Sequence, residues 1–383
     1  MPRATDRRKD NTQSVTGTRF LLIFCIVAGA ALLVYLIGFA DLFPTEVTRA
    51  DMASSTSLVQ KVLPPPVPVL DKAAYDAKML ALANNPAPKP VATSTASSTA
   101  STTPPAAPKY LWPAKGNPYP NVGALLPDHR IVAYYGNFYS TGMGILGQDP
   151  PDIMIPKLKA AAAEWAAADP STPVIPAIDY IAVTAQGSAG ADGKYRARMP
   201  DSQIDKALDL ASQVDGIVIL DVQVGLSNVQ TEIPLLEKYL AMPNVHLALD
   251  PEFAMHSGAK PGSVIGTMDA ADINWTADYL AKLVQDNHLP PKILIIHRFT
   301  ENMVTNYQNI DPLPDVQVVM DMDGWGFGAK KINTYDAVIY PEPVQFTGFK
   351  LFYKNDLKPP STRMLTPAEI LDLTPQPSFI QYQ

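Results

Sequence analysis

The sequence predicts an α/β fold: a (β/α)8 TIM-like barrel, preceded by one transmembrane helix and a disordered linker. Three observations predict the barrel. Short β-branched apolar runs alternate with helical patterns at intervals of about 25–45 residues, as in successive βα units. About eight such units fit within 110–383 of the 383-residue chain, and this kind of barrel takes about 250 residues. Acidic side chains end several of the runs, at the edge where such barrels carry their active sites.

The N-terminal part of the chain predicts where the barrel works. Segment 1–19 is a basic tail, and segment 20–40 is an uncharged apolar stretch long enough to span a membrane as a helix. The arginines before this stretch predict a single-pass cell-membrane protein with a cytoplasmic N-terminus and an extracytoplasmic C-terminal domain. A cleaved signal peptide is the alternative interpretation of the same stretch.

Two further segments precede the barrel domain. Segment 41–84 is expected to be a juxtamembrane region with a short helix at 71–84, where the composition favours helix. Segment 85–109 is largely Pro, Ala, Ser and Thr, so we expect a disordered, extended linker that buries no core. The domain at 110–383 has no cysteine, and its core alone must therefore hold it.

The elements of the domain follow from the hydrophobic pattern. Strands are expected at 131–136, 174–180, 216–223, 245–252, 292–299, 316–323, 337–340 and 348–353. Helices are expected at 151–168, 201–213, 228–240, 270–287, 302–308 and 366–373, the last with Thr366 as its cap and Pro367 at its first position. The helix between the seventh and eighth strands is missing, so an irregular barrel is expected. A Rossmann or flavodoxin-like sheet is the rival, although no Gly-x-Gly-x-x-Gly follows the first strand.

Five carboxylates at strand ends are the candidate catalytic residues. Asp221 ends the third strand, Asp250 and Glu252 end the fourth, and Asp321 and Asp323 end the sixth. Because residues two apart share a face of a strand, each pair points into the barrel mouth. Clustered carboxylates raise at least one pKa, which leaves one group protonated near neutral pH. Glycoside hydrolysis requires a protonated acid beside an ionised one.

Each carboxylate is given a role on this hypothesis. Glu252 is expected to be the general acid, because its longer side chain reaches farther from the strand end, and Asp250 to orient it or tune its pKa. Asp221, Asp321 or Asp323 would stabilise positive charge that develops on the sugar. Asp250 as a helix cap and Asp323-Gly324 as a simple turn are the structural alternatives.

Aromatic and polar side chains near strand ends are expected to bind the sugar. The expected substrate-binding residues are Tyr134, Tyr135, Gln223, His297, Trp325 and Tyr353. Trp325 is the best supported of the aromatic residues, because glycines surround it in Asp-Gly-Trp-Gly-Phe-Gly. His297 ends the fifth strand, and the sequence leaves open which face of that strand points inward.

Several motifs carry a resemblance to known proteins. They are Tyr134-Tyr-Gly, Gly142-Met-Gly-Ile-Leu-Gly147, Leu220-Asp-Val-Gln, Leu247-Ala-Leu-Asp-Pro-Glu252, Val264-Ile-Gly and Gly348-Phe-Lys-Leu-Phe-Tyr353. With them, the chain from about Arg130 onwards resembles a poorly characterised family of bacterial surface or secreted proteins with a glycoside-hydrolase-like barrel. This resemblance implies a fold and a location.

The Asp250-x-Glu252 pair is also distantly similar to the Asp-x-Glu of chitinase-like and lysozyme-like barrels. That likeness implies that Glu252 is the proton donor. The chain departs from the chitinase pattern at His246-Leu-Ala-Leu249, where those proteins carry further acids and glycines. The departure argues against substrate-assisted chemistry.

Together these observations predict a membrane-anchored, extracytoplasmic domain that hydrolyses a cell-envelope glycan. A non-catalytic barrel that binds a glycan or the cell wall is the first alternative. A Mg²⁺- or Ca²⁺-dependent phosphodiesterase-type hydrolase is the second, because carboxylates are the ligands that these ions prefer. No cofactor and no set of metal ligands are predicted, since the five histidines form no zinc motif. The net charge of −7 argues against nucleic acid as a partner.

Overall fold

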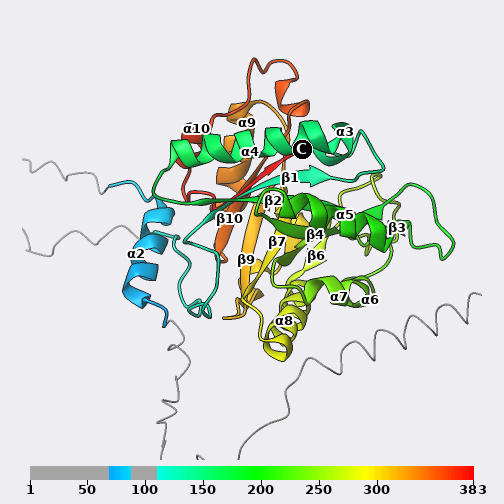
Figure 1. Cartoon of the computed structure of the whole chain (residues 1–383), viewed down its shortest axis with the longest axis horizontal. Coiled ribbons are helices and arrows are strands. Elements are labelled where there is room, and N and C mark those ends of the chain that lie inside the picture. Colours follow the sequence, from blue (N-terminus) through cyan, green and yellow to red (C-terminus); the bar gives the residue numbers. More distant parts are fainter. Residues whose placement is uncertain (1–68, 88–109) are drawn as a thin grey trace, which may run out of the picture. The chain divides into compact units, whose positions relative to one another are not determined.

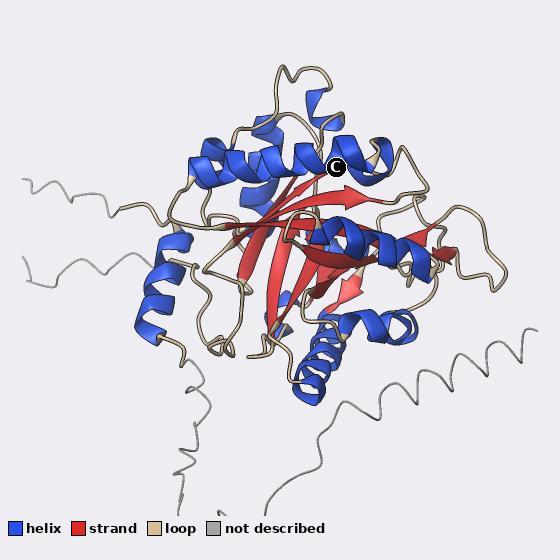
Figure 2. Ribbon diagram, in the orientation of Figure 1, coloured by secondary structure: helices blue, strands red, loops and turns tan. Residues whose placement is uncertain are grey.

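Parallel strands form a closed barrel in the part of the chain that the structure describes, residues 69–87 and 110–383 of a computed structural model. The main sheet has nine strands, and its first strand pairs with both β11 and β2, which closes the ring. The strand β3 (Arg196–Arg198) pairs antiparallel with β2 and lies outside the ring, so eight parallel strands make the barrel. The barrel that the sequence predicts is therefore confirmed (Figures 1 and 2).

The first six barrel strands lie where the hydrophobic runs predict them. The barrel strands are β1 (Arg130–Gly136), β2 (Val174–Ala185), β4 (Ile217–Val222), β5 (Val245–Leu249), β7 (Lys292–Arg298), β9 (Val316–Met322), β10 (Phe346–Leu351) and β11 (Phe379–Tyr382). A separate two-stranded sheet pairs β6 (Met268–Asp269) with β8 (Val304–Thr305). Most barrel strands are β-branched and buried on both faces, as parallel barrel strands must be.

The last two strands differ from the prediction. The segment 337–340, expected to be the seventh strand, lies in and directly after a π-helical turn at Tyr335–Ile339. The segment 348–353 overlaps β10, which is the seventh barrel strand, and the eighth is β11. A helix was expected to be missing between the seventh and eighth strands. The structure has one there, because the helix Pro367–Leu371 lies between β10 and β11. Four apolar residues suit a helix as well as a strand, so the pattern alone could not decide.

Helices cover the outside of the barrel (Figure 2). They are α3 (Ile145–Gln148), α4 (Pro151–Ala168), α5 (Asp201–Ser212), α6 (Val229–Glu232), α7 (Glu237–Leu240), α8 (Ala270–Asn287), α9 (Gly328–Thr334) and α10 (Pro367–Leu371), with short 3-10 turns at Ile233–Leu236, Pro251–Phe253, Glu301–Met303, Tyr307–Asn309 and Asn355–Leu357. The predicted cap of the last helix is confirmed, since Thr366 and Glu369 form a capping box with Pro367 at the first position. Helix α4 buries Met154, Leu158 and Trp165 at helical spacing against the strands.

A helix outside the expected domain bounds covers the amino end of the barrel. Helix α2 (Lys72–Ala83) begins at Asp71, whose side chain accepts a hydrogen bond from the amide of Ala74. Its Met79 packs with the apolar residues inside the barrel, and the carbonyl of Leu82 accepts a hydrogen bond from the amide of Gln376. The short helix that the sequence assigns to a juxtamembrane region is thus part of the barrel floor (Figure 1).

Inward-facing side chains divide the barrel interior into two halves. The lower half is largely apolar: besides His246, it contains Ile131, Ala133, Ala177, Ile217, Ile219, Ala248, Ile293, Ile295, Val319, Phe346 and Phe379. Farther along each strand, by two residues in most strands and by four in β10, the same face carries the upper half, namely Tyr135, Asp179, Asp221, Asp250, His297, Asp321, Lys350 and Gln381. Polarity therefore changes abruptly along the barrel axis.

The predicted membrane span at 20–40 and the predicted linker at 85–109 lie outside the described residues, apart from 85–87. Among the helices at 69–87 and 110–383, none has the length and apolar character needed to cross a bilayer.

Candidate active site

A cavity of about 490 Å³ opens above the upper half of the barrel interior. Its walls include Tyr135, Gln223, Asp250, Glu252, Phe253, Phe299, Asp323, Trp325, Lys330, Lys350 and Phe352. All of these residues except Lys330, which belongs to helix α9, lie at the carboxyl ends of the strands or in the segments that follow them. The cavity is thus at the end of the barrel where such folds carry their active sites.

One wall of the cavity is acidic. Asp250 directly follows β5, and its Oδ2 accepts a hydrogen bond from Gln223 Nε2 at 3.2 Å. Its other oxygen caps the turn Pro251–Phe253 by accepting from the amide of Glu252 at 3.2 Å. Asp250 therefore caps the turn, as the structural alternative expects, and it also lines the cavity. The cap fixes the direction in which the chain leaves the strand. Burial, reinforced by the charge of Asp221, raises the pKa of Asp250 well above its usual range.

Glu252 lies on the same wall, partly buried, and its side chain lines the cavity. Among the described residues, its carboxyl group has no ion pair and no hydrogen-bonding side chain. Burial raises the pKa of Glu252, and the charge of Asp323 raises it further. Lys350 and His297 oppose this shift. Glu252 is thus a carboxyl group whose pKa is shifted towards protonation and whose oxygens have no side-chain partner among the described residues.

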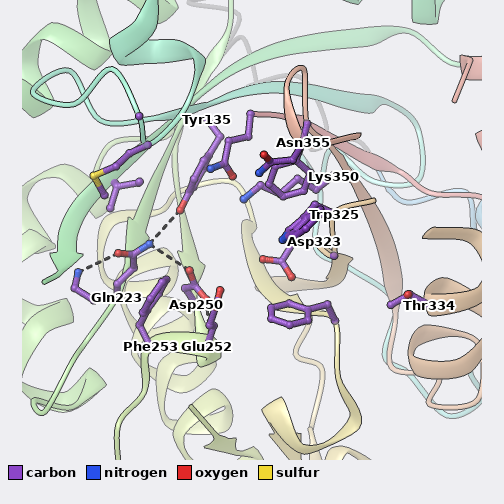
Figure 3. Close-up of a pocket in the computed structure, with 18 of the residues that line it drawn as sticks. Tyr135, Gln223, Asp250, Glu252, Phe253, Asp323, Trp325, Thr334, Lys350 and Asn355 are labelled. Carbon is purple, nitrogen blue, oxygen red and sulfur yellow. Dashed lines mark hydrogen bonds between the residues drawn. The ribbon is translucent and has the colours of Figure 1, made fainter. Parts of the chain in front are cut away.

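Asp323 and Trp325 lie on the facing wall, with Lys350 beside them (Figure 3). Asp323 is 7% exposed, and its Oδ2 is 3.7 Å from His297 Nδ1. Burial raises the pKa of Asp323, and the positive charges of His297 and Lys350 oppose the rise. The Lys350 ammonium lies 3.8 Å from the centre of the Tyr135 ring.

The Trp325 loop is held from below by a buried carboxylate. Asp356 Oδ1 accepts a hydrogen bond from the amide of Gly326 at 2.9 Å, and its Oδ2 pairs with Lys331 Nζ at 2.8 Å. Gly326 has a φ of +145°, a backbone conformation that residues with a side chain rarely adopt. The loop therefore presents the indole, which is 49% exposed, at the rim of the cavity.

A buried histidine joins two of the predicted acids beneath the cavity. His297 Nε2 is 3.0 Å from Asp221 Oδ2, and His297 Nδ1 is 3.1 Å from Asp321 Oδ2. All three side chains are fully buried. Burial alone would lower the pKa of His297, but hydrogen bonds to Asp221 and Asp321 outweigh it and raise this pKa well above its usual value. The ring is therefore an imidazolium that donates to a carboxylate on each side.

Two further features complete this buried layer. Asp179 Oδ2 accepts a hydrogen bond from Gln381 Nε2 at 2.6 Å, and burial, with the charge of Asp221, raises the pKa of Asp179 to about 8. Gly348 lies opposite Asp321 on the neighbouring strand. A Cβ at Gly348 would stand 2.5 Å from Asp321 Oδ1, so only glycine leaves room for that carboxylate.

The structure separates the predicted catalytic residues into two groups. Asp250, Glu252 and Asp323 line the cavity. Asp221 and Asp321 do not, because they lie under it and bond to the histidine. The expectation that either of these two stabilises charge on a sugar directly therefore does not fit their position, and their effect on a ligand would act through His297.

The predicted substrate-binding residues also divide. Tyr135, Gln223 and Trp325 line the cavity, and Gln223 Nε2 lies 3.2 Å from the hydroxyl of Tyr135. Tyr134 and Tyr353 do not line it. They point outward from the barrel, where their hydroxyls bond to each other at 2.9 Å and both rings pack on Tyr382. Their expected role in binding substrate does not fit this position.

His297 points inward, which settles the question of its face, but it lies below the cavity lining.

Three residues of this region are not among the predicted site residues. Asp179 and Lys350 are buried in the upper half of the interior, and Gln381 bonds to the first of them. A carboxylate inside the apolar run Val174-Ile-Pro-Ala-Ile-Asp was a usable signal, because an unpaired acid is rare in a buried strand. Lys350 and Gln381 were harder to predict. Lys350 lies in a strand that was expected as the eighth and is the seventh, and Gln381 lies in a strand that was not expected.

The described residues offer no metal centre: within 69–87 and 110–383, no three His, Cys, Asp or Glu side chains are arranged to hold an ion. The positive charges of Lys350 and His297 lie instead among the acids.

Comparisons with known proteins give structural neighbours only. No family model and no curated protein matches the chain. Among solved structures, the cellulase Cel5C_n is 14% identical with a TM-score of 0.32, and the match covers 58% of this chain and 65% of the cellulase. XEG5A, a GH5 xyloglucan-specific endo-beta-1,4-glucanase from a metagenomic library, in complex with cellotriose, is 12% identical with a TM-score of 0.33, covering 64% and 81%. A GH18 chitinase from Pseudoalteromonas aurantia is 10% identical with a TM-score of 0.31, covering 66% and 93%.

The chain thus spans slightly less than two thirds of the length of the cellulase. Matches with TM-scores this low say nothing about the function of this chain.

Proposed function

We propose that the barrel domain hydrolyses glycosidic bonds, with Glu252 as the proton donor. One observation carries the proposal. Glu252 is a cavity-lining carboxyl group without an ion pair among the described residues, and its pKa is raised by burial and by Asp323 across the cavity. General acids require a carboxyl group that is still protonated near neutral pH and free to reach the leaving oxygen.

Asp323 supplies the second carboxyl group of the mechanism. His297 and Lys350 oppose the rise in the pKa of Asp323 that burial causes, and His297 Nδ1 lies 3.7 Å from Asp323 Oδ2, so these two positive charges favour the ionised form of Asp323. In the reaction, Glu252 protonates the glycosidic oxygen as its bond to the anomeric carbon breaks. Asp323 stabilises the positive charge that develops on the sugar ring. Water then adds to the anomeric carbon and returns a proton to Glu252.

The remaining polar residues position these two groups. Gln223 holds Asp250 and Tyr135, and Asp250 holds the turn that carries Glu252. Trp325 offers an exposed aromatic surface to a sugar ring at the rim. Asp250 is thus a positioning residue, which is the role that the sequence analysis gave it.

The test is glycan turnover by the full-length protein beside two matched variants. Glu252→Gln removes the acidic proton at nearly constant shape, and Glu164→Gln makes the same change on the exposed face of helix α4. Release of reducing ends from peptidoglycan and from common neutral and acidic glycans would be measured. We expect Glu252→Gln to lower the rate by about 10²–10⁴-fold and Glu164→Gln to leave it unchanged. Equal rates in all three proteins would overturn the proposal.

One observation favours a second candidate, a glycan-binding barrel without catalysis. Two of the five predicted acids are bonded to His297 and buried, as in a purely structural network. On this alternative, the wild-type protein and Glu252→Gln would bind the same glycan equally and neither would cleave it.

A further inference from the structure

The two walls of the cavity differ in charge. Asp250 and Glu252 lie on one side, whereas two lysines, Lys330 and Lys350, line the other together with Asp323 and Trp325. Lys358 adds a third cation, with its ammonium 5.0 Å from the centre of the Trp325 ring, and Lys330 Nζ lies 4.9 Å from the same centre. A ligand against the indole therefore meets two ammonium groups at once.

These lysines are not neutralised by the protein. The lysines that form ion pairs within 69–87 and 110–383 are Lys78, Lys157, Lys238, Lys282 and Lys331. Lys330, Lys350 and Lys358 are not among them. Lys330 makes one hydrogen bond, to the carbonyl of Trp325 at 3.1 Å. In a chain with a net charge of −7, Lys330 and Lys358 beside one exposed aromatic ring place local positive charge next to the acidic cavity.

A second cavity of about 480 Å³ adjoins the first. The two share Phe299, Lys330 and Thr334 in their walls, and the second continues past Phe327, which is 38% exposed. Lys330 thus lies where the two cavities meet. The part that belongs to the second cavity contains no carboxylate in its lining.

We propose that the substrate is an anionic glycan chain, which runs from the acidic wall of the first cavity past Trp325 into the second cavity. Its carboxylate or phosphate groups lie against Lys330 and Lys358, and a sugar ring lies on Trp325. This inference rests on the proposed function and specifies its substrate class. A neutral glycan gains the aromatic contact only, whereas an anionic one also gains two cations that form no ion pair within 69–87 and 110–383.

Binding measurements on the full-length Glu252→Gln protein test this proposal, because slow turnover leaves the ligand intact. The ligands are a hexasaccharide of galacturonic acid, a glucose hexasaccharide that carries phosphate esters, and neutral cellohexaose, titrated by calorimetry at low salt. We expect at least one anionic ligand to bind about tenfold more tightly than the neutral one, with an advantage that shrinks at high salt. The better of the two anionic ligands identifies the acid group.

Paired lysine variants give the control. Lys330→Gln with Lys358→Gln should weaken binding of the anionic ligand about tenfold, since each exposed charge pair contributes modestly. Lys115→Gln with Lys159→Gln makes the same change in net charge outside both cavities and should change nothing. Tighter binding of cellohexaose, or an anionic affinity that is unchanged by the first pair, would overturn the proposal. Glu252-dependent cleavage of a neutral glycan in the wild-type protein would leave the proposed function standing even then.

Discussion

Two histidines point into the same barrel from neighbouring strands, and their surroundings give them opposite charge states. His246 lies in the apolar lower half, where its Nδ1 accepts a hydrogen bond from the amide of Ile293 at 3.0 Å. Burial lowers the pKa of His246 to about 3, and the charge of Lys292 adds to that effect. His297 lies in the upper half between two carboxylates, and its pKa is raised well above its usual value.

The comparison teaches that partners, and not burial, decide what a buried titratable group does. Both rings are almost fully removed from solvent. A backbone amide can donate only to a neutral ring nitrogen, so His246 is a structural residue. Two carboxylates stabilise a charged ring, so His297 supplies a positive charge beneath the cavity. That charge favours the ionised form of Asp323.

The largest expected effect comes from removing the charged ring. His297→Leu leaves Asp221 and Asp321 buried without their shared cation, which should lower the free energy of unfolding by about 3–5 kcal/mol. Because the pKa of His297 is raised, its contribution is fully present below about 6.5 and is lost as pH rises through the raised value. Urea denaturation at pH 6 measures the effect, and a loss below about 1 kcal/mol would contradict the ion network.

A second test uses Asp179, a buried carboxyl group whose pKa is raised. Burial raises the pKa of Asp179 from its usual 3.8 to about 8 in the folded protein. The stability that the protonated group contributes is therefore present below about pH 4 and is lost as pH rises towards 8. Asp179→Asn removes the burial of a charge and keeps an oxygen for Gln381. We expect it to stabilise the protein at pH 9 by on the order of a few kcal/mol, and to have little effect at pH 4. Denaturation at the two pH values would show equal effects if Asp179 titrated normally.

A third test concerns space beside Asp321. Gly348→Ala would put a methyl group 2.5 Å from Asp321 Oδ1 and 2.9 Å from a ring carbon of Phe379, so the carboxylate must move away from His297. The expected loss of stability is about 1–3 kcal/mol by overpacking. Gly187→Ala is the matched control, since nothing lies within 4 Å of its Cβ position. An equal loss of stability in the two variants, measured by thermal or urea unfolding, would argue against close packing beside Asp321.

The smallest expected effect lies in the lower half of the barrel. His246→Leu removes one hydrogen bond to a buried amide and should lower the free energy of unfolding by about 1–2 kcal/mol. This loss is expected at pH 8. Because the pKa of His246 is lowered from its usual 6.5 to about 3, the unfolded chain binds a proton at pH 5 that the folded protein does not bind, so the loss should be smaller at pH 5 than at pH 8. A loss that is equal at the two pH values, or larger at pH 5, would show that the fold does not hold His246 neutral, and the contrast with His297 would fail.

The barrel could be predicted because its strands are long β-branched runs separated by helices of ordinary length. The prediction failed where runs were short. Ala337-Val-Ile-Tyr340 belongs to a helical turn, and Phe379–Tyr382 was not recognised as a strand because it has four residues and includes a glutamine. Ring closure depends on that last strand pairing with β1, a contact between distant parts of the chain that no local pattern reveals.

The site could be predicted in part for the same physical reason. Alternation along strands correctly directs Asp250 and Asp321 inward, and the same rule assigns Tyr135 to the inside and Tyr134 to the outside once the inward face of β1 is known. Alternation does not say how deep a residue lies. Asp321 and Asp323 share a face, yet the first is bonded beneath the cavity and the second lines it.

The central claim is that Glu252 delivers a proton to the leaving oxygen, and the dependence on the leaving group tests it most directly. Aryl glycosides with a dinitrophenyl leaving group need no proton, whereas those with a poor leaving group do. The values of kcat/KM for both kinds would be measured with the wild-type protein and Glu252→Gln. We predict a loss of about 10²-fold or more for the poor leaving group and less than about tenfold for the dinitrophenyl glycoside. Equal losses on both substrates, or no loss on either, would contradict the proposed role of Glu252.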